Sequence, residues 1–197
     1  MTSRLIPVLL VGALVAGVSS HVGAQAQDQA PQRPWRTLLS PIFMDNFVSV
    51  GTANWRVADD TVKADDGNGY LVSREAFGDF ELRAEFFASP DANSGFFIRC
   101  SDPQVITAAN CYEVNIFDTR PDPTYATGGI VNVAKVMAKV ESGNKWNTME
   151  ITARGPRLSV RVNGTLISEG EDARLPRGPI ALQRGAGEIR FRNVQIR

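Results

Sequence analysis

Apolar and polar residues alternate along most of the chain beyond residue 41. From Phe80 to Phe86, every second residue is apolar and the residues between them are charged. A period of two is typical of a strand that buries one face and exposes the other. The segment WNTMEITARGPRLSVRVNGTLIS predicts three more strands, with turns at Gly155-Pro156 and Asn163-Gly164. GPIALQ and GEIRFRNVQIR predict the last strands.

Many short strands separated by Gly, Pro and Asn predict an all-β sandwich, formed as one domain over residues 41–197. Residues 25–40 are rich in Pro and Gln and predict a flexible lead. Residues 119–145 carry dense turn residues and only uncertain strands. Long irregular connections often have a functional role, so this segment could form a wall of a pocket.

The first residues predict a targeting signal and not a part of the fold. Arg4 precedes an apolar run from Leu5 to Val18, and small residues follow it. This is typical of a bacterial secretory signal peptide over residues 1–24, with cleavage after Ala24 or Ala26. An uncleaved anchor is the alternative. The run is shorter than the roughly 20 apolar residues of a membrane span. We therefore expect a periplasmic or secreted protein that has no membrane contact after cleavage.

Signal cleavage would remove His21, which is the only histidine. A mature chain without imidazole excludes a Ser-His-Asp triad, a Cys-His pair and a His-ligated zinc site. Acid or base chemistry then depends on Asp, Glu, Lys or Tyr. The 21 basic and 21 acidic residues balance. We therefore expect no nucleic-acid partner and no polybasic membrane patch. The oligomeric state stays open.

Two cysteines, Cys100 and Cys111, lie close together in the chain. In an exported protein they are expected to form a disulfide that closes the loop between them. On the chain-entropy model, such a bridge contributes roughly 2–3 kcal/mol to stability.

Polar residues interrupt the two strand-like runs beside these cysteines. If Phe96, Ile98 and Cys100 face the core, Phe97 and Arg99 lie on the opposite face. In the next run, Tyr112, Val114 and Ile116 are apolar, which leaves Glu113 and Asn115 for that same face. Direct pairing of Cys100 with Cys111 would separate Arg99 from Glu113, so we expect Cys111 to lie off the ladder. Arg99, Glu113 and Asn115 together could bind a polyol. Alternatively, Arg99 and Glu113 could form an ordinary cross-strand ion pair worth less than about 1 kcal/mol.

Several segments together resemble a known family. They are YLVSREAFGDFELRAEF, NSGFFIR, YEVNIFD, KWNTMEITARGPRLSVRVNG, GPIALQ and IRFRNVQIR, in this order. They resemble the 3-keto-disaccharide hydrolase family over about Phe43 to Arg197. The resemblance implies a two-sheet antiparallel jelly-roll sandwich of the concanavalin A-like or laminin G-like type, and a small carbohydrate or glycoside as substrate.

The resemblance also implies a reaction. A ketone at C3 of a sugar acidifies the C2 proton, a base removes that proton, and the enolate expels the group at C1 before water adds. By position in the family pattern, Glu113 would be the base or a substrate ligand and Arg99 the clamp for the enolate oxygen or a hydroxyl. Asp118 and Gln183 would be supporting ligands, beside Asn115 and Phe97.

One segment departs from the family. Members often carry Asp-His-Gly after the IALQ strand, where this chain has Arg184-Gly185-Ala186-Gly187. This departure favours a non-catalytic carbohydrate-binding module as the alternative function. We expect no required cofactor and assign no metal ligand, although carboxylate oxygens could hold Ca²⁺ or Mg²⁺.

The tryptophans and the spacing of the carboxylates bear on which function is favoured. A binding module would use exposed aromatic platforms, for which Trp35, Trp55 and Trp146 are candidates, although each can equally be a packing residue. A conventional glycosidase is disfavoured, because Glu113 and Asp118 would lie roughly 16 Å apart on an extended strand. A scaffold that binds a protein partner and no sugar stays open as a third class.

Overall fold

The computed structural model describes residues 1–2 and 33–197, and residues 33–197 form one compact unit. The expected signal peptide and cleavage sites fall almost wholly outside the described residues. The first strands of the unit are β1 (Arg36–Leu39), β2 (Phe47–Gly51), β3 (Arg56–Ala58), β4 (Thr61–Ala64), β5 (Gly69–Phe77), β6 (Phe80–Ala88) and β7 (Asn93–Ile98). They are followed by β8 (Tyr112–Ile116), the 3₁₀ helix η1 (Pro123–Tyr125), β9 (Trp146–Arg154), β10 (Arg157–Val162), β11 (Thr165–Glu171), β12 (Gly178–Ala186) and β13 (Ile189–Ile196).

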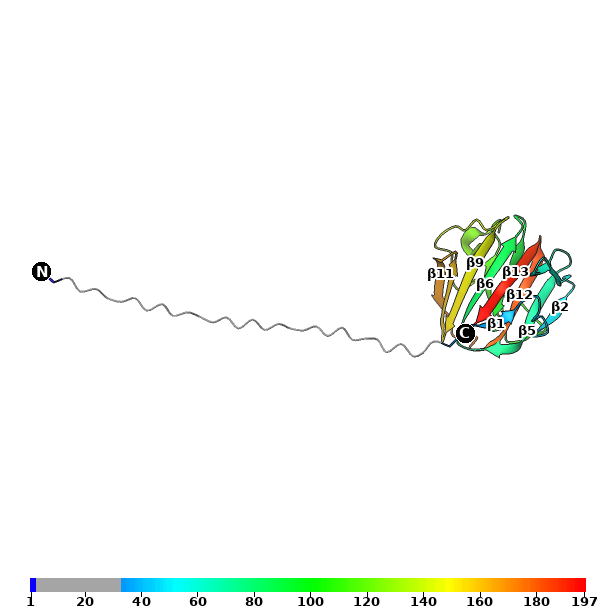
Figure 1. Ribbon diagram of the computed structural model, residues 1–197, viewed down its shortest axis with the longest axis horizontal. Coiled ribbons are helices and arrows are strands. Elements are labelled where there is room, and N and C mark those ends of the chain that lie inside the picture. The colour runs from blue at the N-terminus through cyan, green and yellow to red at the C-terminus, as the bar shows by residue number, and fades with distance from the viewer. Residues whose placement is uncertain (3–32) are drawn as a thin grey trace. The chain divides into compact units, whose positions relative to one another are not determined.

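These strands form two antiparallel sheets. The eight-stranded sheet has the order β11-β10-β9-β6-β13-β4-β3, and β1 also pairs with β13. The five-stranded sheet has the order β2-β5-β12-β7-β8. Figure 1 shows β9, β6 and β13 side by side in the first layer, while β5 and β12 belong to the second. The predicted all-β sandwich of two antiparallel sheets is confirmed.

The core lies between the two sheets, where both inner faces are apolar. The alternation predicted from Phe80 to Phe86 is confirmed, because Phe80, Leu82, Ala84 and Phe86 are buried and the charged residues between them are more exposed. Phe96 of the five-stranded sheet meets Phe191 of the other sheet with their ring centroids 5.3 Å apart. Aromatic contacts of this kind join the two layers.

The turns predicted from Gly, Pro and Asn are also confirmed. Gly155 joins β9 to β10 with a φ of +51°, and the hairpin between β10 and β11 has Asn163 at +50° and Gly164 at +77°. Both hairpin residues take the positive φ that a tight two-residue connection requires. The start of the fold differs from the sequence-based boundary. Residues 36–39 form β1, which pairs with β13, so the sandwich begins within the expected lead.

The connection between β8 and β9 is irregular, as the sequence predicted, and η1 is the one helix within it. It runs along the outer edge of β8, where the amide of Val131 donates to the carbonyl of Glu113 and the amide of Asn115 donates to Gly129. The edge of the five-stranded sheet is therefore covered by the chain's own loop. No helix in the described part of the chain is long and apolar enough to cross a membrane.

Candidate functional site

The outer face of the five-stranded sheet brings together several of the predicted site residues. In the β7–β8 register, Phe97 pairs with Glu113 and Gly95 pairs with Asn115. Side chains at alternate positions of a strand share a face. Because Phe96 and Val114 point into the core, Phe97, Glu113 and Asn115 lie together on the opposite face. The prediction that Glu113 and Asn115 share one face is confirmed.

The neighbouring strands extend this group. Gln183 of β12 lies opposite Gly95, and Tyr70 of β5 lies opposite Gln183. A row therefore runs Tyr70, Gln183, Gly95 and Asn115 across four strands. Tyr70 packs edge-on against Phe97 with ring centroids 5.3 Å apart. Glycine at position 95 places no side chain between Gln183 and Asn115.

Polar atoms of this row lack partners. The Oε1 atom of Gln183 and the Oδ1 atom of Asn115 are buried and have no hydrogen-bond partner. The Glu113 carboxylate forms no hydrogen bond or ion pair with any residue that the structure describes. Buried polar groups in folded proteins are nearly always paired, and an exception requires an explanation. Three side chains on one sheet face that each have an oxygen without a partner are an arrangement that a polyhydroxyl ligand could satisfy.

Glu113 lies on the same face as this row, and its pKa is shifted. Burial raises the pKa of Glu113, and the positive charge of Arg120 offsets part of that rise. Burial also raises the pKa of Tyr70, the nearby Gln183 side chain opposes the rise, and the charge of Glu113 adds to it. A carboxylate with a raised pKa is a stronger base than an exposed one, and a neutral phenol on the same face can donate a proton.

The irregular segment after β8 holds the polar row in position. The Asn115 side-chain amide donates to the Tyr125 carbonyl over 2.6 Å. Main-chain hydrogen bonds from this segment also fix β8 at Glu113 and Asn115. The segment therefore contacts the polar row at its β8 end.

Arg99 does not lie with this group, so its predicted place beside Glu113 is wrong. Its φ of +52° ends β7 and interrupts the alternation of faces that the prediction assumed. The side chain is 1% exposed and spans the end of the sandwich. It donates to the carbonyls of Gly78, Gly155 and Leu175 and to the Asp79 carboxylate, over 2.6–3.4 Å. These contacts give Arg99 a structural role.

Asp118 is likewise occupied by its own loop. Its two oxygens accept hydrogen bonds from the hydroxyls of Thr127 and Ser142 and from the amides of Ser142 and Gly143, over 2.6–3.1 Å. Four donors leave little capacity for a substrate. Asp118 therefore fixes the connection between β8 and β9, and the structure gives no support to its predicted role as a ligand.

The predicted disulfide between Cys100 and Cys111 is present, and Cys111 lies just before the first ladder residue of β8, as expected. Cys100 does not face the main core, in contrast to the prediction. Both cysteines pack with Phe97 and Ile106 in a second apolar cluster on the outer face. The positive φ of Arg99 explains the difference, because it reverses the face of the following residue. The bridge thus anchors the 101–110 loop over this face.

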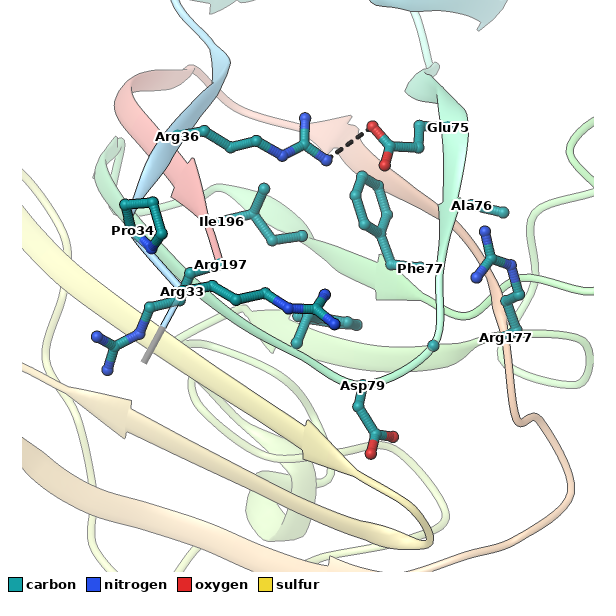
Figure 2. A pocket seen from close by; sticks show the side chains of 12 residues that line it. Arg33, Pro34, Arg36, Glu75, Ala76, Phe77, Asp79, Arg177, Ile196 and Arg197 are labelled. Carbon is teal, nitrogen blue, oxygen red and sulfur yellow. Dashed lines mark hydrogen bonds and ion pairs between the residues drawn. The ribbon is translucent and has the colours of Figure 1, made fainter. Parts of the chain in front are cut away.

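A separate hollow of about 510 Å³ lies at the far end of β5. Figure 2 shows Arg36 reaching to Glu75 beside the Phe77 ring, with Arg197 on another side of the hollow. The Arg36 guanidinium lies 2.7 Å from Glu75, and Arg197 forms an ion pair with Glu81. Arg36, Glu75 and Arg197 are therefore paired, whereas Arg33 and Arg177 line the hollow as exposed cations.

The described residues contain no group of three or more His, Cys, Asp or Glu side chains that could hold a metal ion. This leaves binding of Ca²⁺ or Mg²⁺ open. The candidate site therefore consists of uncharged amides, a phenol and one carboxylate, with Arg120 as the nearby cation.

Comparison with known families identifies the chain. Residues 26–197 match the model of the 3-keto-alpha-glucoside-1,2-lyase-like domain, which is the 3-keto-disaccharide hydrolase family. The chain belongs to this family. The predicted membership is thereby confirmed over most of the sequence. No curated protein matches the chain.

Solved structures support the fold of this family member. A protein from Parabacteroides distasonis, provisionally described as a glycosyl hydrolase, is 24% identical, with a TM-score of 0.69 over 84% of this chain and 99% of that one. Carbohydrate-binding module CBM66 from Bacillus subtilis is 16% identical, with a TM-score of 0.59 over 76% and 93%. A galectin-like protein from Bacillus subtilis is 13% identical, with a TM-score of 0.62 over 78% and 89%. The chain is a carbohydrate-related β-sandwich.

Sequence-based reasoning missed two residues that act on the candidate site. Tyr70 and Arg120 were not singled out from the sequence, yet the charge of Glu113 acts on the pKa of Tyr70 and the charge of Arg120 acts on that of Glu113. No polar alternation marks Tyr70, because its side of β5 also carries Val72 and Ala76. Arg120 follows an irregular turn, and no periodicity could place it; its Nε atom is buried without a hydrogen-bond partner.

The departure of this chain from the family pattern also has a structural description. The Arg184 guanidinium donates to the carbonyls of Asp65, Gly67 and Gly187 at the end of the five-stranded sheet. It therefore stabilises loops, and it supplies neither a carboxylate nor an imidazole at this position.

Proposed function

We propose that this family member cleaves 3-keto-glucosides by elimination across C1 and C2, with Glu113 as the base. The observation that carries the proposal is the half-buried Glu113 carboxylate, which has a raised pKa and no partner among the described residues. It shares a sheet face with the unpaired amide oxygens of Gln183 and Asn115. Perturbed carboxyls in such settings are candidates for acid–base catalysis.

In the proposed reaction, Glu113 takes the C2 proton and the C3 ketone accepts the electron pair as an enolate. The enolate then collapses, C1=C2 forms, and the C1–O bond breaks with its electron pair on the leaving oxygen. That oxygen takes a proton and departs as an alcohol. Addition of water across the new double bond completes a net hydrolysis. No oxidant or metal ion enters this balance.

The remaining residues of the row have roles that fit this chemistry. Tyr70, kept neutral by its raised pKa, would protonate the leaving oxygen. The unpaired oxygens of Gln183 and Asn115 would accept hydrogen bonds from sugar hydroxyls. Arg120 would hold the enolate oxygen, which is the role first expected of Arg99. The disulfide fits an oxidising compartment and so supports export.

A non-catalytic carbohydrate-binding module is the second candidate. It is favoured by Arg184 and the glycines after it, which stand where family members often carry Asp-His-Gly. The same row of unpaired oxygens would then bind a sugar without cleaving it. Turnover separates the two candidates.

The decisive test follows the loss of methyl 3-keto-glucoside by NMR. We expect turnover by the wild-type protein and a fall in kcat/KM of at least about 100-fold in Glu113→Gln, because the variant lacks the base. Glu81→Gln on the other sheet is the control and should keep its activity. A parallel sample with EDTA reports on Ca²⁺ or Mg²⁺. Wild-type binding of the sugar without turnover would instead establish the binding module.

A further inference from the structure

A groove of about 360 Å³ lies on the same outer face as the polar row, at the β2 edge of the five-stranded sheet. Its floor and sides are mainly apolar. They include Val48, Val50, Val72, Ala76, Pro103 and Pro179. Gln104 and Arg74 also line it, and both are exposed. Apolar groups therefore dominate the inner part of the groove.

The groove is continuous with the polar row through the strand register. Val50 of β2 lies opposite Tyr70, which lies opposite Gln183, followed by Gly95 and Asn115 on the next two strands. Neighbouring strands are about 4.8 Å apart, so Val50 and Gly95 are roughly 14 Å apart. This length accommodates one sugar ring and a second group of similar size.

The 101–110 loop lies between the groove and Glu113, and it covers the row of residues next to the polar row. Ile106 is 7% exposed and packs on Val72, Phe97 and Ala181, in the cluster that includes the disulfide. A ligand over Glu113 therefore cannot reach the groove directly across Phe97. It must pass over Tyr70, the proposed proton donor to the leaving oxygen.

We propose that the groove binds the leaving group of the substrate, and that this group is an apolar alcohol in preference to a second sugar. This inference rests on the proposed function and names its substrate class. The keto-sugar lies over Gln183 and Gly95, its glycosidic oxygen lies at Tyr70, and the apolar group extends over Val50 toward Val48. The valines cannot satisfy the hydroxyls of a second sugar, and desolvating a hydroxyl without a partner is costly.

Three 3-keto-glucosides test the proposal: one with a methyl, one with a cyclohexylmethyl and one with a glucosyl leaving group. The methyl and cyclohexylmethyl groups leave as primary alcohols of similar acidity, so their difference in kcat/KM reports binding and not chemistry. We expect the cyclohexylmethyl compound to exceed the methyl compound by about tenfold. The glucosyl compound should show no such gain.

Isosteric variants test whether the groove causes this difference in kcat/KM. Val48→Thr combined with Val50→Thr should reduce the cyclohexylmethyl-to-methyl ratio of kcat/KM by at least about fivefold. Val57→Thr is the matched control, because Val57 is an exposed strand valine of the other sheet. Thermal unfolding of each variant confirms that the sandwich is intact.

The outcomes separate this inference from the proposed function. Turnover of all three compounds at similar kcat/KM would overturn the apolar leaving-group site and leave the reaction standing. If no compound is turned over, saturation-transfer NMR with unoxidised cyclohexylmethyl glucoside provides a second measurement. Contacts to the cyclohexyl ring that are lost in the double variant would support the groove while the reaction fails. A lack of contacts would overturn the groove as well.

Discussion

The outer faces of the two sheets differ in how their polar groups are satisfied. On the eight-stranded sheet, Glu81 binds Arg154 and Arg197, and Glu85 binds Arg192 and Asn193. On the five-stranded sheet, Glu113 has no partner among the described residues. Both faces look equally polar in the sequence. Only the structure shows that Glu81 and Glu85 are paired on one face, whereas Glu113 is not paired on the other.

The pKa values follow this difference. Burial alone would raise the pKa of Glu81, but the hydrogen bonds from Arg154 and Arg197 outweigh burial and lower it. For Glu113, burial dominates and the pKa rises. Paired carboxylates stabilise a fold, whereas an unpaired half-buried carboxylate costs stability and is retained where it serves another purpose.

The aromatic residues show the same contrast. The Arg192 guanidinium lies 3.9 Å from the centre of the Trp146 ring, and Arg83 and Arg197 lie 4.3 and 4.5 Å from that of Trp35. Trp55 packs against Phe191. None of the three tryptophans lies on the face that carries Glu113. Their contacts indicate packing roles, the interpretation that the sequence left beside that of sugar platforms.

The largest expected effect concerns Arg99, which is buried but belongs to the structural part of the molecule. Arg99→Ala leaves its three acceptor carbonyls without their donor, and we expect a loss of about 3–5 kcal/mol in the free energy of unfolding. Urea denaturation measures this loss. Arg161→Ala removes an exposed arginine and should cost less than about 0.5 kcal/mol. Unchanged stability with lost turnover in Arg99→Ala would return Arg99 to the active site.

A smaller effect on stability is expected when Glu113 or Glu81 is made neutral. The folded pKa of Glu113 is above its ordinary value of 4.5, so ionised Glu113 destabilises the fold, and this cost grows as pH rises through the raised pKa. The folded pKa of Glu81 is lowered, so its stabilisation is present above 4.5 and disappears as pH falls through the lowered pKa. The two residues therefore predict opposite responses to neutral substitution.

At pH 7, Glu113→Gln should raise Tm by about 2–4 °C, whereas Glu81→Gln should lower it by a similar amount. Both differences should shrink as the pH falls to about 4 and below. Thermal unfolding followed by circular dichroism is sufficient for the measurement. A decrease in Tm in Glu113→Gln at pH 7 would mean that the carboxylate has a stabilising partner, and the contrast between the faces would be lost.

Much of the fold could be predicted from the sequence, because strand alternation and turn residues are local signals. The hairpin at Asn163-Gly164 and the strand from Phe80 are examples. The alternation of Tyr112, Val114 and Ile116 also placed Glu113 and Asn115 on one face correctly. The error at Arg99 has a physical cause: alternation holds only while the chain stays extended, and one residue with positive φ ends it. Nothing in the local pattern of FFIRC reveals that conformation.

The hydrogen-bond partners of the polar side chains could not be predicted from the sequence. Asp118 looked like a ligand by its place in the family pattern, but its role depends on Ser142 and Gly143, more than twenty residues later in an irregular loop. Tyr70 comes near Glu113 only through the intervening strands β12 and β7. Long-range pairing of this kind is a property of the assembled sandwich.

The central claim is that the face with unpaired groups is the functional face. The most direct test is ¹H–¹⁵N NMR of Glu113→Gln titrated with methyl 3-keto-glucoside, since this variant should bind the sugar without consuming it. The account predicts shifts in the side-chain amides of Gln183 and Asn115 and none in the indoles of Trp35 and Trp146. Shifts confined to those indoles would contradict it, because they would place the ligand on the face of the paired carboxylates Glu81 and Glu85.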